Sequence, residues 1–340
     1  MCKNIKHHSN IDKKIIKPKS ILVDIKSNSN VKADTTLDKE IVSFLDQVKF
    51  ERIKSKVNFM SNHFPNRHNK STKIHEAADW LMNEFKTIGY KDVYLDNYKA
   101  NIGGNNYELS NVICQKNAKN RKGKEKKFIL LCAHYDTILN IEGGDLPDVR
   151  APGANDNASG VSAILEIAHI LYGHELNYDI QFALFSGEEQ GLLGSKHYAQ
   201  YVKKNGINIF RLINLDMIGT PFPDPNIVII EVDHNDDPTY NKTLENDSDS
   251  IKLGKMMRNI TSTYTNLEFE PGLVWGSDYQ YFESKGFVVV GVYDGGAVDS
   301  NNYSNPDYHS VTDTPDKIDW NYLASITKMV LATILTLNKE

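Results

Sequence analysis

The sequence has little of what would place it in a membrane, on a nucleic acid or in a disulfide-rich class. No apolar run approaches the roughly 18–20 residues that a membrane-spanning helix needs. The 39 Lys and Arg residues are outnumbered by 44 Asp and Glu residues, and the net charge of −5 provides no basic field for a nucleic-acid partner. Three cysteines, Cys2, Cys114 and Cys132, are too few for a disulfide framework and odd in number.

The chain is long enough for one large domain with a sizeable core, since 40% of its 340 residues are hydrophobic. Residues 1–38 are rich in Lys, Asn, Ser and Asp, and we expect a disordered or extended arm there. Residues 39–340 are predicted to form a single domain, because neither a repeat nor a second boundary follows. No apolar leader is visible. Cys2 fits either a processed, lipid-anchored form or a chance cysteine.

Apolar patterns alternate between strands and helices along most of the domain. Because such alternation favours a parallel sheet covered on both faces, the expected fold is α/β, a single-domain three-layer α/β/α sandwich with a mixed, mostly parallel sheet. Cys114 and Cys132 fall in predicted strands and should be buried thiols. The predicted strands are 93–95, 109–114, 128–133, 180–185, 209–215, 226–232 and 287–293. One helix is predicted to begin at residue 38, and five more are predicted over 72–88, 158–172, 192–202, 251–264 and 320–337.

Polar residues stand where several of these strands end. His134, Glu188 and Asp216 each follow a predicted buried strand, and Asp156 lies at the loop-to-helix junction after the His134 strand. Ligands of open α/β sheets bind beyond the carboxyl ends of the strands, so these four side chains should meet at one edge. Clustered carboxylates repel one another unless cations neutralise them, as two zinc ions would. Imidazole combined with carboxylates suits zinc better than magnesium or calcium.

Each residue alone also has a simpler structural interpretation. His134 could be an ordinary histidine at the edge of the core, and Asp156 a helix N-cap. The pair Glu188-Glu189 could be a surface pair, and His309 lies in a polar loop. Taken together, these interpretations require several independent coincidences, so we prefer the metal site. Asp136, two residues after His134, is then best explained as a carboxylate that fixes the imidazole tautomer and ring orientation.

Five segments carry a resemblance to a known family that is more specific than any single short motif. They are His134-Tyr135-Asp136, residues 153–160 (GANDNASG), residues 185–195 (FSGEEQGLLGS), residues 214–219 (NLDMIG) and Tyr308-His309. In these segments the sequence resembles the co-catalytic dizinc aminopeptidases, the group of aminopeptidase Y and bacterial leucyl aminopeptidase. That group is related to glutamate carboxypeptidase and glutaminyl cyclase. The resemblance implies a zinc-exopeptidase-like peptidase domain over residues 39–340.

The resemblance also implies two zinc ions per chain and a ligand set for them. His134 and Asp216 would hold one ion, Glu189 and His309 would hold the other, and Asp156 would bridge the two. Imidazole and carboxylate ligands of this kind are consistent with the preference of zinc.

Three further residues receive catalytic roles from the resemblance. Glu188 would be the general base that takes a proton from the attacking water and passes it to the leaving amine. Tyr308 would help to stabilise the oxyanion, and Asp136 would orient His134.

The implied function is that of a metallo-aminopeptidase, which hydrolyses the N-terminal peptide bond of peptide substrates with a free N-terminus. A glutaminyl cyclase-like acyltransferase, a related carboxypeptidase or dipeptidase and a non-enzymatic relative are the alternatives. The last expects lost ligands, and none of the proposed ones is missing. Ser277-Asp278-Tyr279 stands where the family often has Ser-Asp-His, which leaves the side-chain preference open. The resemblance implies an extracellular or cell-envelope location, whereas the missing leader leaves the cytoplasm open.

Overall fold

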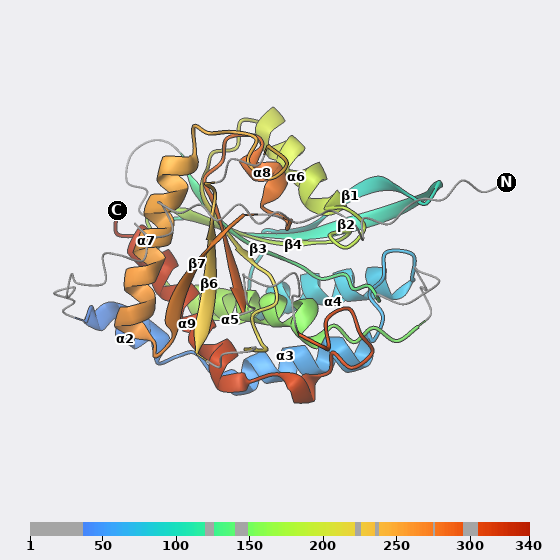
Figure 1. Ribbon diagram of the computed structural model, residues 1–340, viewed down its shortest axis with the longest axis horizontal. Coiled ribbons are helices and arrows are strands. Elements are labelled where there is room, and N and C mark those ends of the chain that lie inside the picture. Colours follow the sequence, from blue (N-terminus) through green and yellow to red (C-terminus); the bar gives the residue numbers. More distant parts are fainter. Residues whose placement is uncertain are drawn as a thin grey trace.

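The fold is built around one eight-stranded sheet with the strand order β1-β2-β4-β3-β5-β8-β6-β7 (Figure 1). A computed structural model of the chain describes residues 37–119, 126–139, 149–221, 226–234, 238–274, 276–294 and 305–340. The predicted arm, residues 1–38, lies outside the described residues except for its last two positions. Among the helices in those ranges, none combines the length and apolar character needed to cross a membrane.

The sheet is mixed, as the sequence predicted. β3 pairs in parallel with both β4 and β5, and β5 pairs in parallel with β8. β2 runs antiparallel to β1 and β4, while β6 runs antiparallel to β8 and parallel to β7. The strands are β1 (Val93–Ile102), β2 (Asn105–Lys116), β3 (Phe128–His134), β4 (Asp179–Phe185), β5 (Ile209–Leu215), β6 (Ile227–Val232), β7 (Glu268–Leu273) and β8 (Val289–Asp294).

Helices cover both faces of the sheet, which gives the predicted three layers. In Figure 1, α3, α4, α5 and α9 lie below the sheet, and α6 and α8 lie above it. α7 packs against β6 and α9, and α2 also contacts α9. The helices are α2 (Lys39–Leu45), α3 (Phe50–His63), α4 (Lys73–Ile88), α5 (Gly160–Leu171), α6 (Leu193–Lys204), α7 (Asp247–Tyr264), α8 (Gln280–Glu283) and α9 (Trp320–Leu337).

Each face of the sheet supports its own apolar core, and β3 shows why. Ile129 and Leu131 belong to the core shared with α5 and α9, whereas Leu130 and Cys132 belong to the core shared with α6. Successive side chains of a strand point to opposite faces, so a strand buried on both faces must be apolar throughout. The prediction of buried thiols is confirmed, since Cys114 and Cys132 are both buried and free.

Three elements were missed from the sequence, namely α3, β7 and the four-residue α8, and one hairpin is longer than predicted. Helix α3 buries a narrow stripe of Ile53, Val57 and Met60 among charged residues, so its apolar signal is weak. Strand β7 contains Pro271, which a strand tolerates at the edge of a sheet, and β7 is an edge strand. β1 and β2 pair up to the turn 103–104, where both glycines have positive φ, the geometry that two-residue hairpin turns require.

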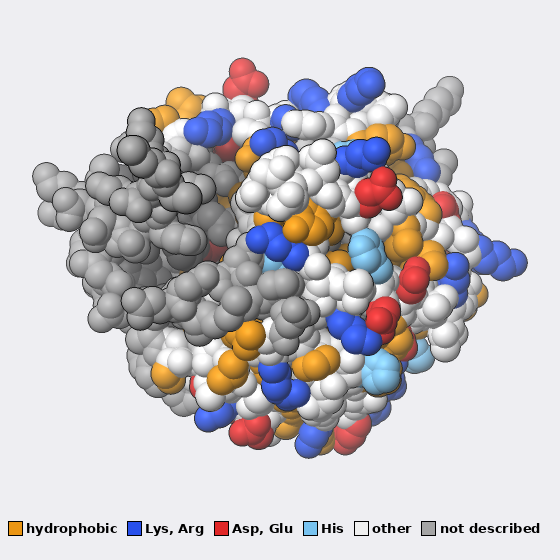
Figure 2. All heavy atoms as spheres, turned by 90° about the vertical axis from the view of Figure 1, so that its right-hand side faces the viewer, with side chains coloured by type: hydrophobic (Ala, Val, Ile, Leu, Met, Phe, Trp, Pro, Cys, Tyr) orange, Lys and Arg blue, Asp and Glu red, His pale blue; other side chains and the backbone are white. Residues whose placement is uncertain are grey.

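One face of the molecule carries a mixed surface. Figure 2 shows Lys and Arg side chains interspersed with Asp, Glu and scattered hydrophobic side chains over the described part of that face. The described residues there form no continuous basic stripe of the kind that nucleic-acid-binding proteins present.

The two-sided burial of β3 predicts a large cost for removing one of its side chains. Leu131 is 0% exposed, and we expect Leu131→Ala to lower the free energy of unfolding by about 2–5 kcal/mol, because the lost apolar contacts leave a cavity. Leu244→Ala is the matched control, since Leu244 is 72% exposed. Urea denaturation of both variants measures the difference, and equal costs would contradict the two-core description.

Candidate metal centre

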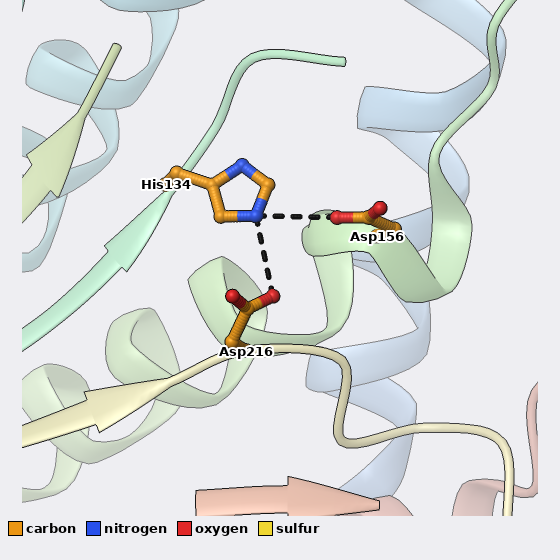
Figure 3. Close-up of side chains that lie close together, drawn as sticks. All are labelled: His134, Asp156 and Asp216. Atoms are coloured by element: carbon orange, nitrogen blue, oxygen red, sulfur yellow. Dashed lines mark hydrogen bonds and ion pairs between the residues drawn. The ribbon is translucent and has the colours of Figure 1, made fainter. Parts of the chain in front are cut away.

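The carboxyl ends of β3 and β5 bring a histidine and an aspartate together. His134 is the last residue of β3, and Asp216 directly follows β5. Nε2 of His134 lies 3.3 Å from Oδ1 of Asp216 and 3.2 Å from Oδ1 of Asp156, and the three side chains point toward one another (Figure 3). All three residues are buried, so the group forms a compact site at the sheet edge.

A second histidine approaches the same aspartate from the opposite side. Nε2 of His309 lies 3.2 Å from Oδ2 of Asp156 and 2.9 Å from Oε2 of Glu189. The two oxygens of Asp156 therefore face different imidazoles, that of His134 and that of His309. Tyr308 stacks on the ring of His309 with 3.7 Å between ring centroids and remains partly exposed.

Asp156 is not the cap of a helix, so that alternative interpretation is wrong. Its φ of −108° and ψ of 90° are non-helical, and helix α5 begins only at Gly160. Its carboxylate oxygens contact the two imidazoles instead of helix N–H groups. The buried carboxylate of Asp313 accepts hydrogen bonds from the backbone N–H groups of Asn155 (2.8 Å) and Asp156 (2.9 Å) and so fixes this segment.

Asp136 fixes the backbone of the two adjacent glutamates. Its carboxylate accepts hydrogen bonds from the backbone N–H groups of Glu188 and Glu189, both at 3.2 Å, and from Nδ2 of Asn69 at 2.7 Å. Its Oδ1 is 3.6 Å from Nδ1 of His134, which is beyond hydrogen-bond length. The orienting role that the sequence assigned to Asp136 toward His134 thus stays a prediction, while its contacts with the glutamate backbone are an addition.

A chain of hydrogen bonds holds Asp216 from behind. Oγ of Ser277 donates to Oδ2 of Asp216 and accepts from Nδ2 of Asn214, both at 2.7 Å. The thiol of Cys132 donates to Oδ1 of Asn214 at 3.3 Å, so it faces this chain. Oδ1 of Asp216 is left directed at His134. Because one oxygen is occupied by Ser277, the geometry favours Asp216 as a ligand through a single oxygen.

The charges of the site perturb its ionisable groups in opposite directions. Burial opposes ionisation of Asp156, but hydrogen bonds from His134 and His309 outweigh it and hold the pKa of Asp156 below its usual range. Burial is also the main cause that raises the pKa of Glu189 to about 7 and that of Glu188 well above its ordinary value. Burial lowers the pKa of His309, yet Glu189 and Asp156 outweigh it and raise that pKa to about 11. Such a cluster stabilises positive charge within it.

A buried arginine ties together the loops that carry the site. Arg67 is 0% exposed and donates to the backbone carbonyls of Tyr135 (2.7 Å), Pro152 (2.8 Å) and Gly153 (2.9 Å). It thereby joins the segment after β3 to the segment that leads into Asp156. Burial lowers the pKa of Arg67 to about 10, so the guanidinium remains charged at neutral pH.

Sequence reasoning missed three residues that position the site: Arg67, Asn69 and Asp313. All three are buried and lie outside the helices and strands, so no apolar periodicity marked them. A polar run that stays buried after a helix, as residues 66–69 do, becomes visible only once the fold is known. By contrast, the eight predicted site residues do lie around one edge of the sheet.

The model of one protein family matches most of the sheet and all the proposed metal ligands. The family model of "Peptidase family M28" matches residues 111–334. The chain belongs to peptidase family M28. That match contains His134, Asp156, Asp216 and His309 together with both adjacent glutamates. The predicted resemblance and the predicted enzyme class, a metallo-aminopeptidase acting on peptide bonds, are confirmed.

Two curated proteins are similar in sequence to this chain. A probable leucine aminopeptidase of Trichophyton verrucosum is 28% identical over 303 residues, which is 86% of this chain and 74% of the relative. A probable zinc metalloprotease of Pyrenophora tritici-repentis is 30% identical over 206 residues, which is 55% of this chain and 40% of the relative. The second of these relatives is named for zinc, the metal that the sequence predicted.

Solved structures share the fold. LapB of Legionella pneumophila has a TM-score of 0.71 at 24% identity and covers 89% of this chain and 76% of its own. BSAP, a zinc aminopeptidase from Bacillus subtilis, gives 0.68 at 16% identity, with coverage of 85% and 95%. A glutaminyl cyclase of Bacteroides thetaiotaomicron gives 0.67 at 20% identity, with coverage of 85% and 98%. At these identities the likeness confirms the predicted α/β fold.

The clamp formed by Arg67 generates a prediction for stability. Arg67→Met keeps much of the side-chain volume but removes the hydrogen bonds of the guanidinium to the buried carbonyls of Tyr135, Pro152 and Gly153. We expect the free energy of unfolding of metal-free protein to fall by about 3 kcal/mol or more. Arg258→Met is the control, because the guanidinium of Arg258 donates to the side chain of the adjacent Asn259 at an exposed position, and it should change stability by at most about 0.5 kcal/mol. Equal urea midpoints for the two variants would show that Arg67 is not a clamp.

Proposed function

We propose that this M28 peptidase is a two-zinc aminopeptidase that removes the N-terminal residue of peptides. The observation that carries the proposal is the position of Asp156 between two imidazoles. Its Oδ1 lies 3.2 Å from Nε2 of His134, and its Oδ2 lies 3.2 Å from Nε2 of His309. Each imidazole has a further carboxylate of its own, Asp216 for His134 and Glu189 for His309. The site thus contains two groups of three residues, one around His134 and one around His309, and Asp156 belongs to both.

The donor set fits zinc. One imidazole and two carboxylates are available to each ion, a combination that suits zinc, whereas hard cations prefer oxygen alone. Oε1 of Glu189 is buried and has no hydrogen-bond partner, so this carboxylate has an oxygen to spare. His134 and Asp216 would hold one ion, Glu189 and His309 the other, and Asp156 both. When bound, the two zinc ions would lower the pKa of water and polarise the scissile carbonyl.

Glu188 is the residue that we assign to proton transfer. It lies beside His134 and Glu189, and its backbone is fixed by the hydrogen bond to Asp136. Among the described ion pairs, the carboxylate of Glu188 is paired with neither His134 nor His309, whereas that of the adjacent Glu189 is paired with His309. Burial raises the pKa of Glu188, which brings a carboxylate toward the range where it both accepts and returns a proton. Glu188 would take a proton from water and give it to the leaving amine.

Tyr308 is the residue that we assign to hydrogen bonding with the developing oxyanion. Its ring stacks on His309, so its position follows that of a proposed ligand. Burial, with the charges of Glu189 and Asp156, raises the pKa of Tyr308 well above its ordinary value. The phenol therefore keeps its proton at neutral pH and is a hydrogen-bond donor of the kind that stabilises tetrahedral intermediates.

The role of Glu188 predicts a specific kinetic defect. Glu188→Gln preserves the shape of the side chain but removes the proton acceptor, so kcat should fall about 10²–10⁴-fold. The zinc content should stay at the wild-type level, because Glu188 is not a proposed ligand. Glu108→Gln, at an exposed residue, is the control and should retain wild-type kcat. A Glu188→Gln enzyme with wild-type turnover would exclude Glu188 as the base.

The reaction itself separates the aminopeptidase from the cyclase alternative, whose fold is equally similar. A panel of peptide amides that differ only in the N-terminal residue should release free amino acids, which chromatography detects. Wild-type protein and Glu188→Gln are compared on every peptide. Formation of pyroglutamate from N-terminal glutamine, without release of any free amino acid, would favour the cyclase and contradict the proposal.

A further inference from the structure

A second polar cluster lies at the other end of the sheet from the zinc ligands. Asp233 directly follows β6, Asn246 directly precedes α7, and Glu283 ends α8. β6 is antiparallel to β8, so Val232 at its end pairs with Val290 near the start of β8. Asp216 is bonded to β8 near its opposite end, through Val292. In Figure 1 the connection from β6 to α7 passes beside α8 at the top of the view.

Three oxygens in this cluster are buried without a donor. One oxygen of each carboxylate is satisfied: Oδ2 of Asp233 by Nδ2 of Asn246 (2.7 Å), and Oε1 of Glu283 by the backbone N–H groups of Lys242 (2.8 Å) and Thr243 (2.7 Å). Oδ1 of Asp233, Oδ1 of Asn246 and Oε2 of Glu283 have no hydrogen-bond partner. The three residues are 0%, 4% and 0% exposed. Leaving three buried acceptors unpaired is costly, so a positively charged partner is expected.

The charges around these oxygens are mainly negative. Burial first, and then the charges of Glu283 and Asp247, raise the pKa of Asp233 to about 8. Asp247 is already occupied, because its carboxylate accepts from Nδ2 of Asn241 (3.1 Å) and lies 3.2 Å from Nδ1 of His234. Burial raises the pKa of Glu283, although the backbone hydrogen bonds from Thr243 and Lys242 oppose this shift, and the charge of Lys242 opposes it least. Asp233 thus interacts with the charges of Glu283 and Asp247, and Asp233 and Glu283 each have one buried oxygen without a hydrogen-bond partner.

We propose that a calcium ion binds between Asp233, Asn246 and Glu283. Calcium takes about 6–8 oxygen ligands from carboxylates, amide carbonyls and water in adaptable geometry. The three unpaired atoms are all oxygens, which disfavours zinc. Calcium accepts such oxygens in adaptable geometry, whereas magnesium demands a near-ideal octahedron. Water would complete the shell.

The ion would join three segments: the end of β6, the start of α7 and the end of α8. Its consequence is structural. The segment before α8 carries Ser277, whose hydroxyl holds Asp216, so calcium would steady the support of that residue from a distance. The proposed calcium ligands include none of the residues proposed for zinc, so either site can fail without the other.

Calorimetric titration of zinc-loaded protein with calcium chloride tests the proposal. We expect about one calcium ion per chain to bind by about 1 mM, the range of weaker protein calcium sites. The melting temperature should rise and then level off over the same concentrations. Magnesium chloride at equal concentration should give a smaller shift. Absence of saturable binding in wild-type protein overturns the proposal, whatever the variants do.

Variants locate the ion. Asp233→Asn and Glu283→Gln each keep the side-chain shape but remove one ligand charge, and should weaken calcium binding at least tenfold. Asp249→Asn is the control, since Asp249 pairs with Lys252 on the surface, and should bind as wild type. His134→Ala should also leave calcium binding unchanged. Wild-type affinity in Asp233→Asn and Glu283→Gln would show that calcium binds elsewhere and would overturn the assignment.

Discussion

Repulsion among four carboxylates at one edge of the sheet is the constraint on which the rest of the structure depends. Asp156, Glu188, Glu189 and Asp216 surround His134 and His309, and Asp156, Asp216 and His134 are buried. The two imidazoles and Arg67 supply part of the compensating positive charge, and cations held between the carboxylates would supply the rest. Hydrogen bonds from the surrounding loops fix the ligands in place. Ser277 donates to one oxygen of Asp216, and the carboxylates of Asp313 and Asp136 accept from the backbone N–H groups of Asp156 and of the two glutamates.

The sheet topology explains why distant segments meet at the site. β3, β4 and β5 are parallel neighbours, so the residues that follow them share one edge although they lie far apart in the sequence. The loops alone would not hold this geometry, and three buried clamps do so: Arg67 on backbone carbonyls, Asp313 on the backbone before Asp156, and Asp136 on the glutamate backbone. The same sheet, at its other end, gathers the unpaired oxygens proposed for calcium.

Much of this could be predicted from the sequence, and the remainder has physical reasons. The continuous apolar run of β3 predicted a strand buried on both faces and therefore the placement of His134. Helix α3 escaped because only a narrow stripe of it is apolar, and β7 because proline is atypical of strands. The clamps Arg67 and Asp313 escaped because a polar loop residue gives no sign that it will be buried. Strand ends placed the side chain of Asp156 at the edge, whereas its position between two imidazoles followed only from the family resemblance, because His309 lies in a polar loop that no periodicity marks.

The central claim is that this edge of the sheet holds two zinc ions that share Asp156. Elemental analysis of metal-stripped protein reloaded with zinc, with weakly bound metal removed by dialysis, tests it most directly. The account predicts about two zinc ions per chain for the wild type and about one for His309→Ala, which removes a ligand of one ion only. A wild-type chain that retains one zinc ion or none, or a His309→Ala chain that retains as many as the wild type, would contradict the claim.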